Sequence, residues 1–373
     1  MVKIPESNHT IANLIDEHHA SQPDEPRLHL GGSIDDYHAA QPDEPRLHLG
    51  ASSLGHPCER WVWLSFRWAV RETFPGRIRR LFRRGHNEES WIVDDLRAIG
   101  IEIHQTGDSQ KFINFDGHIG GSVDGIIERG VPGAKKSRHI AEFKTHARKS
   151  FDDVTKKGVK DSKPLHYTQM QLYMLGTKID RALYVAVCKD DDRLYIERIK
   201  YDKDHAEKLL ARAKRIATSE RIPPPLSTDA SWYQCKFCAA HSFCHTKQLT
   251  QHVNCRTCAH GTPEKDGTWS CARWARGEGN KIPGDFQITG CDSHVLHPDM
   301  VPWPIKDSND PHEAVYEING KDIRNGEGDA YVYSSREIIA GGEACGDELV
   351  AEVKKTFFGA NIVEVRENTN GMD

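Results

Sequence analysis

Two acidic residues and one lysine have the types and spacing needed to hydrolyse a phosphodiester. Asp124 stands at the end of one predicted strand, in SVDG, and Glu142 and Lys144 stand on the next, in AEFKT. Side chains two residues apart in a strand point to the same face, so Glu142 and Lys144 project together while Phe143 turns into the core. Carboxylates from neighbouring strands are suitable ligands for a hard divalent cation, Mg²⁺ or Mn²⁺.

A metal ion bound there would lower the pKa of a water molecule and offset the charge that grows on a scissile phosphate. The nearby ammonium of Lys144 can position that water or help to deprotonate it. Hydrolysis of a phosphodiester needs little more. The sequence therefore predicts metal-dependent nuclease chemistry centred on Asp124, Glu142 and Lys144.

Residues from two predicted helices extend this centre. GHNEE at residues 85–89 opens a helix, and Glu89 falls one turn after its first glycine, where it can reach the same metal as a third ligand. His86 competes with Glu89 for that role. Gln169 and Tyr173 are four residues apart, which places an amide and a phenol on one helix face. Both are predicted to contact DNA phosphate or the nucleophile.

The motif order G-x-x-x-E, D, E-x-K and Q-x-x-x-Y resembles the RecB-like and lambda-exonuclease-like (phage-type) nucleases of the PD-(D/E)XK superfamily, over roughly residues 52–247. A single E-x-K pattern is common on exposed strands, whereas four motifs in order are more specific. The resemblance implies that Asp124 and Glu142 bind metal and that Lys144 is catalytic, with the Gln and Tyr positions in support. Many relatives have His where this chain has Glu89.

The elements that position these residues follow from periodicity and turn signals. Helices are predicted over 85–99, 164–176 and 204–219, and strands over 101–103, 111–115, 121–128, 140–145, 182–188 and 194–200. A tight turn is expected at Asp116-Gly117. The resemblance implies a restriction-endonuclease-like α/β core, with a mixed central sheet flanked by helices.

The chain has no apolar run of about 18 residues and no secretory signal, so we expect a cytoplasmic protein with no membrane partner, in the host cytoplasm if phage-encoded. That compartment keeps thiols reduced, so the ten cysteines favour metal ligands over disulfides. Cys235-x2-Cys238-x5-Cys244 follows a proline break, and Cys58 lies far upstream. Four thiolates suit either zinc or an iron–sulfur cluster.

This cysteine arrangement resembles that of the iron–sulfur nucleases of the same superfamily, including AddB-type subunits and the nucleases of CRISPR adaptation. In those relatives, one early Cys and three late Cys hold a [4Fe-4S] cluster that joins the two ends of the nuclease domain. The resemblance implies the same cofactor for Cys58, Cys235, Cys238 and Cys244. His241 and His245 are interpreted as bystanders, although either can replace a Cys in a zinc site.

A second set of four cysteines can close a tetrahedral zinc site in a small ribbon-like or knuckle-like module. His260 and His294 are alternative ligands. The tryptophans of this region are interpreted as core residues, with a base-stacking surface as the alternative; they are Trp269, Trp274 and Trp303. Cys188 and Cys345 have no matching partners and are interpreted as packing residues. The four predicted zinc ligands are Cys255, Cys258, Cys271 and Cys291.

Between residues 60 and 84 the chain carries eight arginines against one acid, Glu72, although the net charge of the whole chain is −5. Such a stripe can line a phosphate backbone, or it can be a solvated helix face. The residues predicted to contact DNA are Arg79, Arg80, Arg83 and Arg84.

Four regions are predicted along the chain. Residues 1–50 form an N-terminal arm in which QPDEPRLHLG recurs with a period of 19 residues, and residues 51–248 form the nuclease domain closed by the first cysteine set. Residues 249–304 form the zinc module. Residues 305–373 form a small α+β tail without an assigned role, with strands predicted near 314–317 and 330–334 and a helix over 347–356.

These features together predict an Mg²⁺-dependent deoxyribonuclease, in particular an exonuclease that resects linear DNA ends in recombination, repair or replication. The chain has no G-x-x-x-x-G-K-[ST] motif, so any helicase, recombination or replication partner would be a separate protein. Two alternatives stay open. One is a metal-stapled DNA-binding or assembly protein without activity, and the other is a site-specific endonuclease.

Overall fold

The computed structural model describes residues 30–40, 45–274, 279–357 and 360–363. The chain divides into two compact units, one of residues 1–43 and 73–84 and one of residues 44–72 and 85–373. The first unit contains α2 (Leu30–Ala39) and the first turns of α4 (Gly76–Ala98). Within it, Arg80 forms an ion pair with Asp35. Most of the predicted 19-residue duplication lies outside the described residues.

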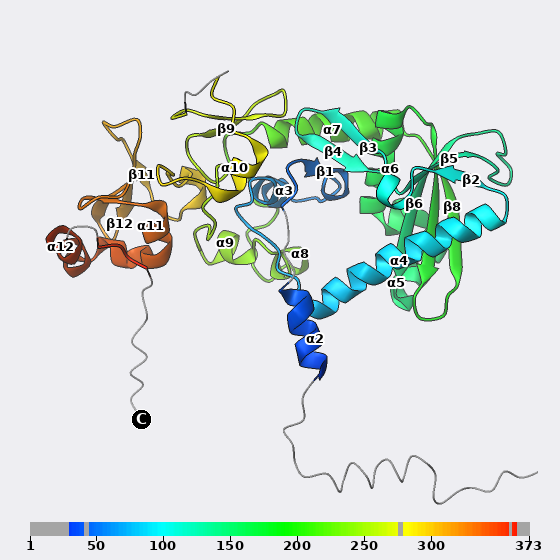
Figure 1. Cartoon of the computed structure of the whole chain (residues 1–373), viewed down its shortest axis with the longest axis horizontal. Coiled ribbons are helices and arrows are strands. Elements are labelled where there is room, and N and C mark those ends of the chain that lie inside the picture. The colour runs from blue at the N-terminus through cyan, green and yellow to red at the C-terminus, as the bar shows by residue number, and fades with distance from the viewer. Residues whose placement is uncertain (1–29, 41–44, 275–278, 358–359, 364–373) are drawn as a thin grey trace, which may run out of the picture. The chain divides into compact units, whose positions relative to one another are not determined.

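The larger unit is built on a mixed five-stranded sheet of order β2-β5-β6-β7-β8 (Figure 1). Its strands are β2 (Glu102–His104), β5 (Gly125–Arg129), β6 (His139–His146), β7 (Arg181–Cys188) and β8 (Leu194–Lys200). The β6–β7 pair is parallel and the other pairs are antiparallel. Helices pack against this sheet, which confirms the predicted restriction-endonuclease-like α/β class.

Burial explains the order of the strands. The β7 segment RALYVAVC is almost continuously buried, as expected of a strand with covered faces, whereas β8 alternates between exposed and half-buried residues along an edge. The parallel β6–β7 pair requires a crossover, which two helices provide. These are α5 (Arg148–Ser162), which the sequence analysis did not predict, and α6 (Pro164–Thr177).

The predicted strand over 121–128 is wrong, because the chain breaks there into two strands of different sheets. The first is β4 (Ile119–Ser122), which pairs with β1 (Leu49–Gly50) and β3 (Phe112–Asp116) in a three-stranded sheet. The second is β5, so Asp124 lies in the connection between the two sheets. The turn after Asp116 is confirmed, since Gly117 there has a φ of +52°.

Two apolar clusters cover opposite faces of the central sheet. Phe143 and Val185 pack with the α4 residues Ile92 and Leu96 on one face. The other face packs with α3 (Glu59–Phe66), α6 and α7 (Lys203–Ala217). Phe143 is therefore in the core as predicted, and the alternation of β6 turns its neighbours Glu142 and Lys144 to the α6 face.

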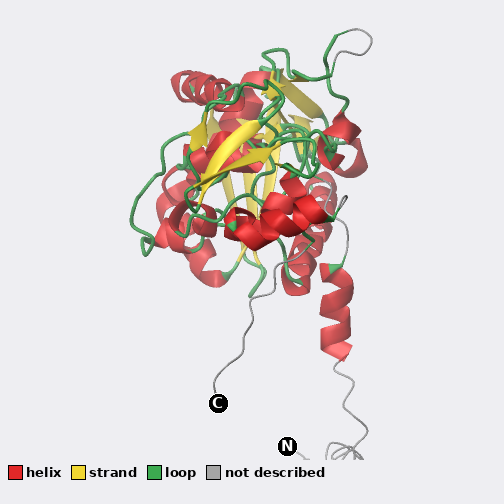
Figure 2. Ribbon diagram, turned by 90° about the vertical axis from the view of Figure 1, so that its left-hand side faces the viewer, coloured by secondary structure: helices red, strands yellow, loops and turns green. Residues whose placement is uncertain are grey.

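The Cys-rich segment and the tail add short elements (Figure 2). The four-stranded tail sheet has the order β11-β12-β13-β14 and its own apolar core. The predicted tail strands near 314–317 and 330–334 and the helix over 347–356 are confirmed. The elements are α8 (Tyr233–Lys236), α9 (His241–His245), β9 (Gly261–Pro263), β10 (Trp269–Cys271), α10 (Gly284–Thr289), β11 (Ile305–Lys306), β12 (Ala314–Ile318), β13 (Lys321–Asn325), β14 (Val332–Tyr333), α11 (Ser335–Gly341) and α12 (Glu348–Thr356).

Single-turn 3-10 helices complete the described chain. They are η1 (Ala51–Ser53), η2 (Gly107–Ser109), η3 (Pro298–Met300) and η4 (Gly342–Gly346). Within the described ranges, no helix has the length and apolar character needed to cross a membrane.

Candidate active site

The structure brings together the three residues at the centre of the predicted chemistry. The backbone N–H of Phe143 donates to Asp124 Oδ2 over 2.8 Å, which fixes the carboxylate beside β6. Lys144 Nζ lies 3.8 Å from the same oxygen and forms a close ion pair with Glu142 Oε1. Residues from a sheet connection and a neighbouring strand thus present two carboxylates and one ammonium to a single point.

The carboxylate of Glu142 is fully buried, with a relative exposure of 0%. Apart from the ion pair with Lys144, neither of its oxygens has a hydrogen-bond donor among the described residues. Burying a carboxylate without donors is costly, by roughly several kcal/mol. A cation at this point would offset that cost, so the residues fit a divalent metal.

Proton affinities in the site reflect an excess of negative charge. Burial raises the pKa of Glu142, and the charges of Asp124 and Glu89 act in the same direction against Lys144. Burial and Asp124 likewise raise the pKa of Glu89 to about 7. Burial alone would lower the pKa of Lys144, but Glu142 and Asp124 outweigh it and raise that pKa. One ammonium therefore does not neutralise the set, and a bound cation would lower these carboxyl pKa values.

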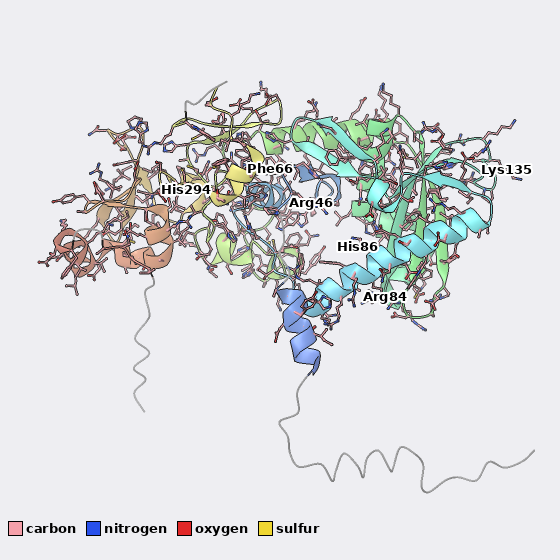
Figure 3. All side chains as sticks on the ribbon, viewed as in Figure 1. Arg46, Phe66, Arg84, His86, Lys135 and His294 are labelled. Atoms are coloured by element: carbon pink, nitrogen blue, oxygen red, sulfur yellow. The ribbon has the colours of Figure 1, made fainter. Side chains whose placement is uncertain are left out.

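The carboxylates open onto a cavity of about 500 Å³ lined by Glu89, Asp124 and Lys144 and by both predicted α6 residues. His86 on α4 and Arg46 ahead of β1 also line it (Figure 3). A neighbouring cavity of about 580 Å³ shares His86, Glu89 and Asp124 with the first. The acidic centre therefore has open space on two sides, and the structure leaves both Glu89 and His86 within the site.

Gln169 and Tyr173 lie on the face of α6 that lines the first cavity. Burial raises the pKa of Tyr173, whose ring stacks on Phe115 with centroids 6.0 Å apart. A Cβ atom at Gly121 would come within 2.6 Å of the Tyr173 hydroxyl, so this phenol reaches the site only because β4 carries a glycine there. The sequence analysis did not single out Gly121.

Other cavity residues also escaped the sequence analysis. Arg46 and His48 line the cavity from the segment before β1, and His166 lines it from α6. A signal existed only for His166, which precedes Gln169 by three residues and so shares its helix face. Arg46 and His48 fall within the repeated segment, whose pattern gives no sign of a role in the site.

The four cysteines of the first predicted set line one small cavity. Cys58 also caps α3, where its Sγ accepts from the backbone N–H of Trp61 over 3.4 Å. Burial raises the pKa of the Cys238 thiol, and the charges of Cys58, Cys244 and Cys235 raise it further. The other three thiols therefore lie close enough to Cys238 to raise its pKa.

The second predicted set, Cys255, Cys258, Cys271 and Cys291, lines another small cavity together with His260 and His294. Both ring nitrogens of His294 already have partners, which are Ser335 at 2.8 Å and the carbonyl of Asn254 at 3.1 Å. Across the described ranges, no three or more His, Cys, Asp or Glu side chains form a preformed metal-binding group. Both thiol sets therefore stay predictions.

The arginine-rich segment does not form one continuous basic stripe. Arg67 is only 1% exposed and donates to the carbonyls of Arg256 and Ser219, so it is a core residue and cannot line a phosphate backbone. Of the four arginines predicted to contact DNA, Arg83 and Arg84 are exposed on α4.

Comparison with known proteins assigns the family. A family model described as the PD-(D/E)XK nuclease superfamily matches residues 38–245, and the chain belongs to this superfamily. The match includes every predicted catalytic residue and all of the first cysteine set.

Solved structures that match the chain include "SSO0001", which is 17% identical, covers 57% of this chain and 92% of its own, and has a TM-score of 0.35. An alkaline exonuclease, LHK-Exo from Laribacter hongkongensis, is 15% identical over 49% of this chain and 89% of its own, with a TM-score of 0.30. Its complex with dAMP is 15% identical, covers 48% of this chain and 89% of its own, and has a TM-score of 0.34. No curated protein sequence matches the chain.

Proposed function

We propose that this protein is a divalent-metal-dependent deoxyribonuclease that hydrolyses phosphodiester bonds at the centre formed by Asp124, Glu142 and Lys144. The observation that carries the proposal is the fully buried Glu142 carboxylate, whose single partner among the described residues is Lys144, beside a cavity that Lys144, Asp124 and Glu89 line. Membership of the PD-(D/E)XK nuclease superfamily supports it.

Asp124, Glu142 and Glu89 would hold Mg²⁺ or Mn²⁺, which when bound supplies Lewis-acid stabilisation and an acidified water. The residues of the chain do the positioning. The backbone of β6 fixes Asp124 through the Phe143 N–H, and the ammonium of Lys144 orients the attacking water. Gln169 contributes an amide that can donate to the phosphate of the DNA.

The more specific proposal is an exonuclease that resects linear DNA ends in recombination, repair or replication. It is supported by the order of the four motifs, which resembles that of lambda-type nucleases. On this proposal Arg79, Arg80, Arg83 and Arg84 contact the DNA backbone, and helicase or recombination activities come from a partner protein.

We also propose that the two cysteine sets bind metal. Cys58 and the three cysteines of 235–244 would hold a [4Fe-4S] cluster, and the second set would hold Zn²⁺. The fit is supported by the convergence of four thiols on each of two cavities. Anaerobically purified protein should be brown and contain iron, and Cys235→Ala should remove the colour while the zinc content stays. A colourless protein that contains only zinc would exclude the cluster.

The nuclease proposal is tested with end-labelled linear DNA and closed circular DNA in Mg²⁺, using the parent protein, Glu142→Ala and Lys144→Ala. We expect the parent protein to degrade linear DNA and spare the circle, and both variants to be inactive. Cutting of the circle at defined places would replace the exonuclease with a site-specific endonuclease. No cutting by folded, cluster-loaded protein would leave a DNA-binding or assembly protein.

A further inference from the structure

A chain of polar side chains leads from the candidate active site into the core. His166 Nδ1 lies 2.9 Å from the hydroxyl of Tyr184, and the same hydroxyl lies 2.8 Å from His146 Nε2. On its other side, His146 Nδ1 lies 3.2 Å from Ser150 Oγ. None of these four residues belongs to the motifs from which the catalytic centre was predicted.

The fold places the first residue of this chain at the site of chemistry. His166 shares the cavity-lining face of α6 with Gln169 and Tyr173, and it lines the same cavity as Lys144 and Asp124. Tyr184 on β7 is the register partner of Glu142 on β6. Since side chains in register on adjacent strands share a face, Tyr184 projects beside Glu142 towards α6, where its hydroxyl reaches His166.

Both imidazoles are neutral at physiological pH. Burial, reinforced by Lys144, lowers the pKa of His166 to about 3. Burial, reinforced by Lys163, lowers the pKa of His146 to about 4. A neutral imidazole has one donor and one acceptor nitrogen, and the Tyr184 hydroxyl has a single proton to donate. Among the described residues the Tyr184 hydroxyl has no partner besides these two imidazoles, so its proton goes to one of them and the other must donate to it. The hydrogen bonds among these four side chains therefore run either all towards His166 or all towards Ser150.

An anion in the cavity selects between these directions. If Ser150 donates to His146, His146 to Tyr184 and Tyr184 to His166, then His166 presents its Nε2–H to the cavity. The reverse order would present a lone pair, which a phosphate oxygen repels. Hydrogen bonds aligned in one direction also polarise one another, which strengthens the last donor.

We propose that His166 is a further catalytic residue whose Nε2–H donates to the reacting phosphate, and that Tyr184, His146 and Ser150 are positioning residues that fix its tautomer. This assignment rests on the proposed nuclease function. It extends the Q-x-x-x-Y face of α6 by one turn towards the helix N-terminus. The donor is oriented before the substrate arrives, so it stabilises negative charge that grows on the phosphate during hydrolysis.

The first test compares His166→Ala with His166→Gln in single-turnover cleavage of a labelled DNA duplex with Mg²⁺. Loss of one such donor should slow cleavage by on the order of 10²-fold in His166→Ala. Gln places an amide N–H near the position of Nε2–H and should recover most of that rate. DNA affinity in Ca²⁺ should change by less than about threefold, because the interaction strengthens in the transition state. An unchanged rate in His166→Ala would overturn the assignment.

The second test is a double-mutant cycle between His166 and Tyr184. Tyr184→Phe keeps the ring but removes the hydroxyl, and we expect about tenfold slower cleavage, with no further effect in the His166→Ala background. Multiplicative effects would mean that Tyr184 acts independently of His166. The matched control is Tyr195→Phe on β8, whose hydroxyl donates to Glu197 over 2.6 Å and should leave the rate unchanged.

A third measurement determines the tautomers of His166 and His146 and does not depend on cleavage activity. In ¹⁵N-histidine-labelled protein bound to a DNA duplex in Ca²⁺, long-range ¹H–¹⁵N correlations should place the protons of His166 and His146 on Nε2. Tyr184→Phe should allow His166 to exchange between tautomers. A proton on Nδ1 of His166 in the complex would overturn the proposal.

Different results would contradict the nuclease proposal and the proposed role of His166. If the parent protein does not cut DNA, or if Lys144→Ala cuts as fast as the parent, the nuclease assignment is wrong. If the parent cuts, Lys144→Ala does not and His166→Ala cuts at the parental rate, only the role of His166 is wrong.

Discussion

Two regions of the larger unit bury charge in opposite ways. The guanidinium groups of Arg67 and Arg256 are each in residues that are 1% exposed. They lie over a cluster of aromatic rings that we call the seam, with Arg256 centred 3.7 Å over the Trp68 ring. The rings of the seam are Trp63, Phe66, Trp68 and Trp269. Arg256 donates to the carbonyls of Phe66 and Leu47 over 2.8 and 2.7 Å. In the catalytic centre, by contrast, the two oxygens of the buried Glu142 carboxylate have only the ammonium of Lys144 as a partner among the described residues.

This difference separates structural from functional charge. Burial lowers the pKa of Arg256 to about 9 and of Arg67 to about 10, so both stay protonated at neutral pH. Carbonyls accept from the terminal nitrogens of both guanidinium groups, and only Nε of Arg67 has no acceptor among the described residues. Through these hydrogen bonds the Cys-rich segment is joined to α3 and to the segment ahead of β1. A satisfied buried charge stabilises the native packing, whereas an unsatisfied one stores free energy that a ligand can recover.

The largest effect is expected from Glu142→Gln, which tests whether the buried carboxylate is functional rather than structural. Cleavage should fall by on the order of 10³-fold, because the change removes a proposed metal ligand. The stability of the metal-free protein should stay close to that of the parent, because the lower cost of burying a neutral amide offsets the lost ion pair with Lys144, whose ammonium keeps Asp124 Oδ2 at 3.8 Å. Cleavage assays and thermal unfolding in EDTA measure the two effects. A clear loss of stability would mean that Glu142 is a structural residue.

The corresponding change in the seam is Arg256→Met, which should lower the stability of the protein and leave its rate of cleavage unchanged. It leaves the carbonyls of Phe66 and Leu47 without donors, so unfolding should cost roughly 3 kcal/mol less. The rate of cleavage by folded protein should not change. Guanidinium unfolding measures the stability. Arg221→Met is the matched control, because Arg221 is 82% exposed in its pair with Asp299 and should contribute below about 1 kcal/mol.

A buried histidine makes the seam sensitive to acid. His118 is 4% exposed, its ring lies 5.2 Å from Phe66 and 5.8 Å from Trp269, and burial lowers its pKa from 6.5 to about 4. Between pH 6.5 and 4 the unfolded chain binds a proton there that the folded chain does not. Stability is therefore fully present above pH 6.5 and is lost as pH falls towards 4.

Replacing this histidine isolates its share of the acid sensitivity. Between pH 7.5 and 5, the parent should lose about 2 kcal/mol more of unfolding free energy than His118→Gln, measured by guanidinium unfolding at both values. Equal pH dependence in the two proteins would mean that His118 takes up its proton equally well in the folded state.

The smallest expected effect is on the exposed arginines. Replacing Arg83 and Arg84 with Glu should weaken DNA binding by about tenfold and reduce its dependence on salt, because fewer counterions are released. The stability of the protein should not change. Fluorescence anisotropy with a labelled duplex across a salt series measures both quantities. Binding equal to that of the parent would identify these residues as a solvated helix face.

The sequence by itself determined the local patterns. Alternation along β6 placed Phe143 in the core and turned Glu142 and Lys144 to the opposite face, because strand geometry repeats every two residues. Helical spacing likewise placed Gln169 and Tyr173 on one face of α6. The strands β6, β7 and β8 and the helices α6 and α7 were predicted because their apolar residues recur with the period of the element. The start of α4 was wrong, since the helix begins at Gly76 rather than Gly85, and α5 was not predicted.

Only the tertiary structure decided how distant segments meet. It placed Asp124 in a connection between two sheets, buried Arg67 among aromatic rings and joined His166 to His146 through Tyr184. No local period encodes such contacts. The local sequence around an arginine, for example, is the same whether its guanidinium donates to carbonyls or to water. Its burial therefore depends on the residues that pack around it from elsewhere in the chain.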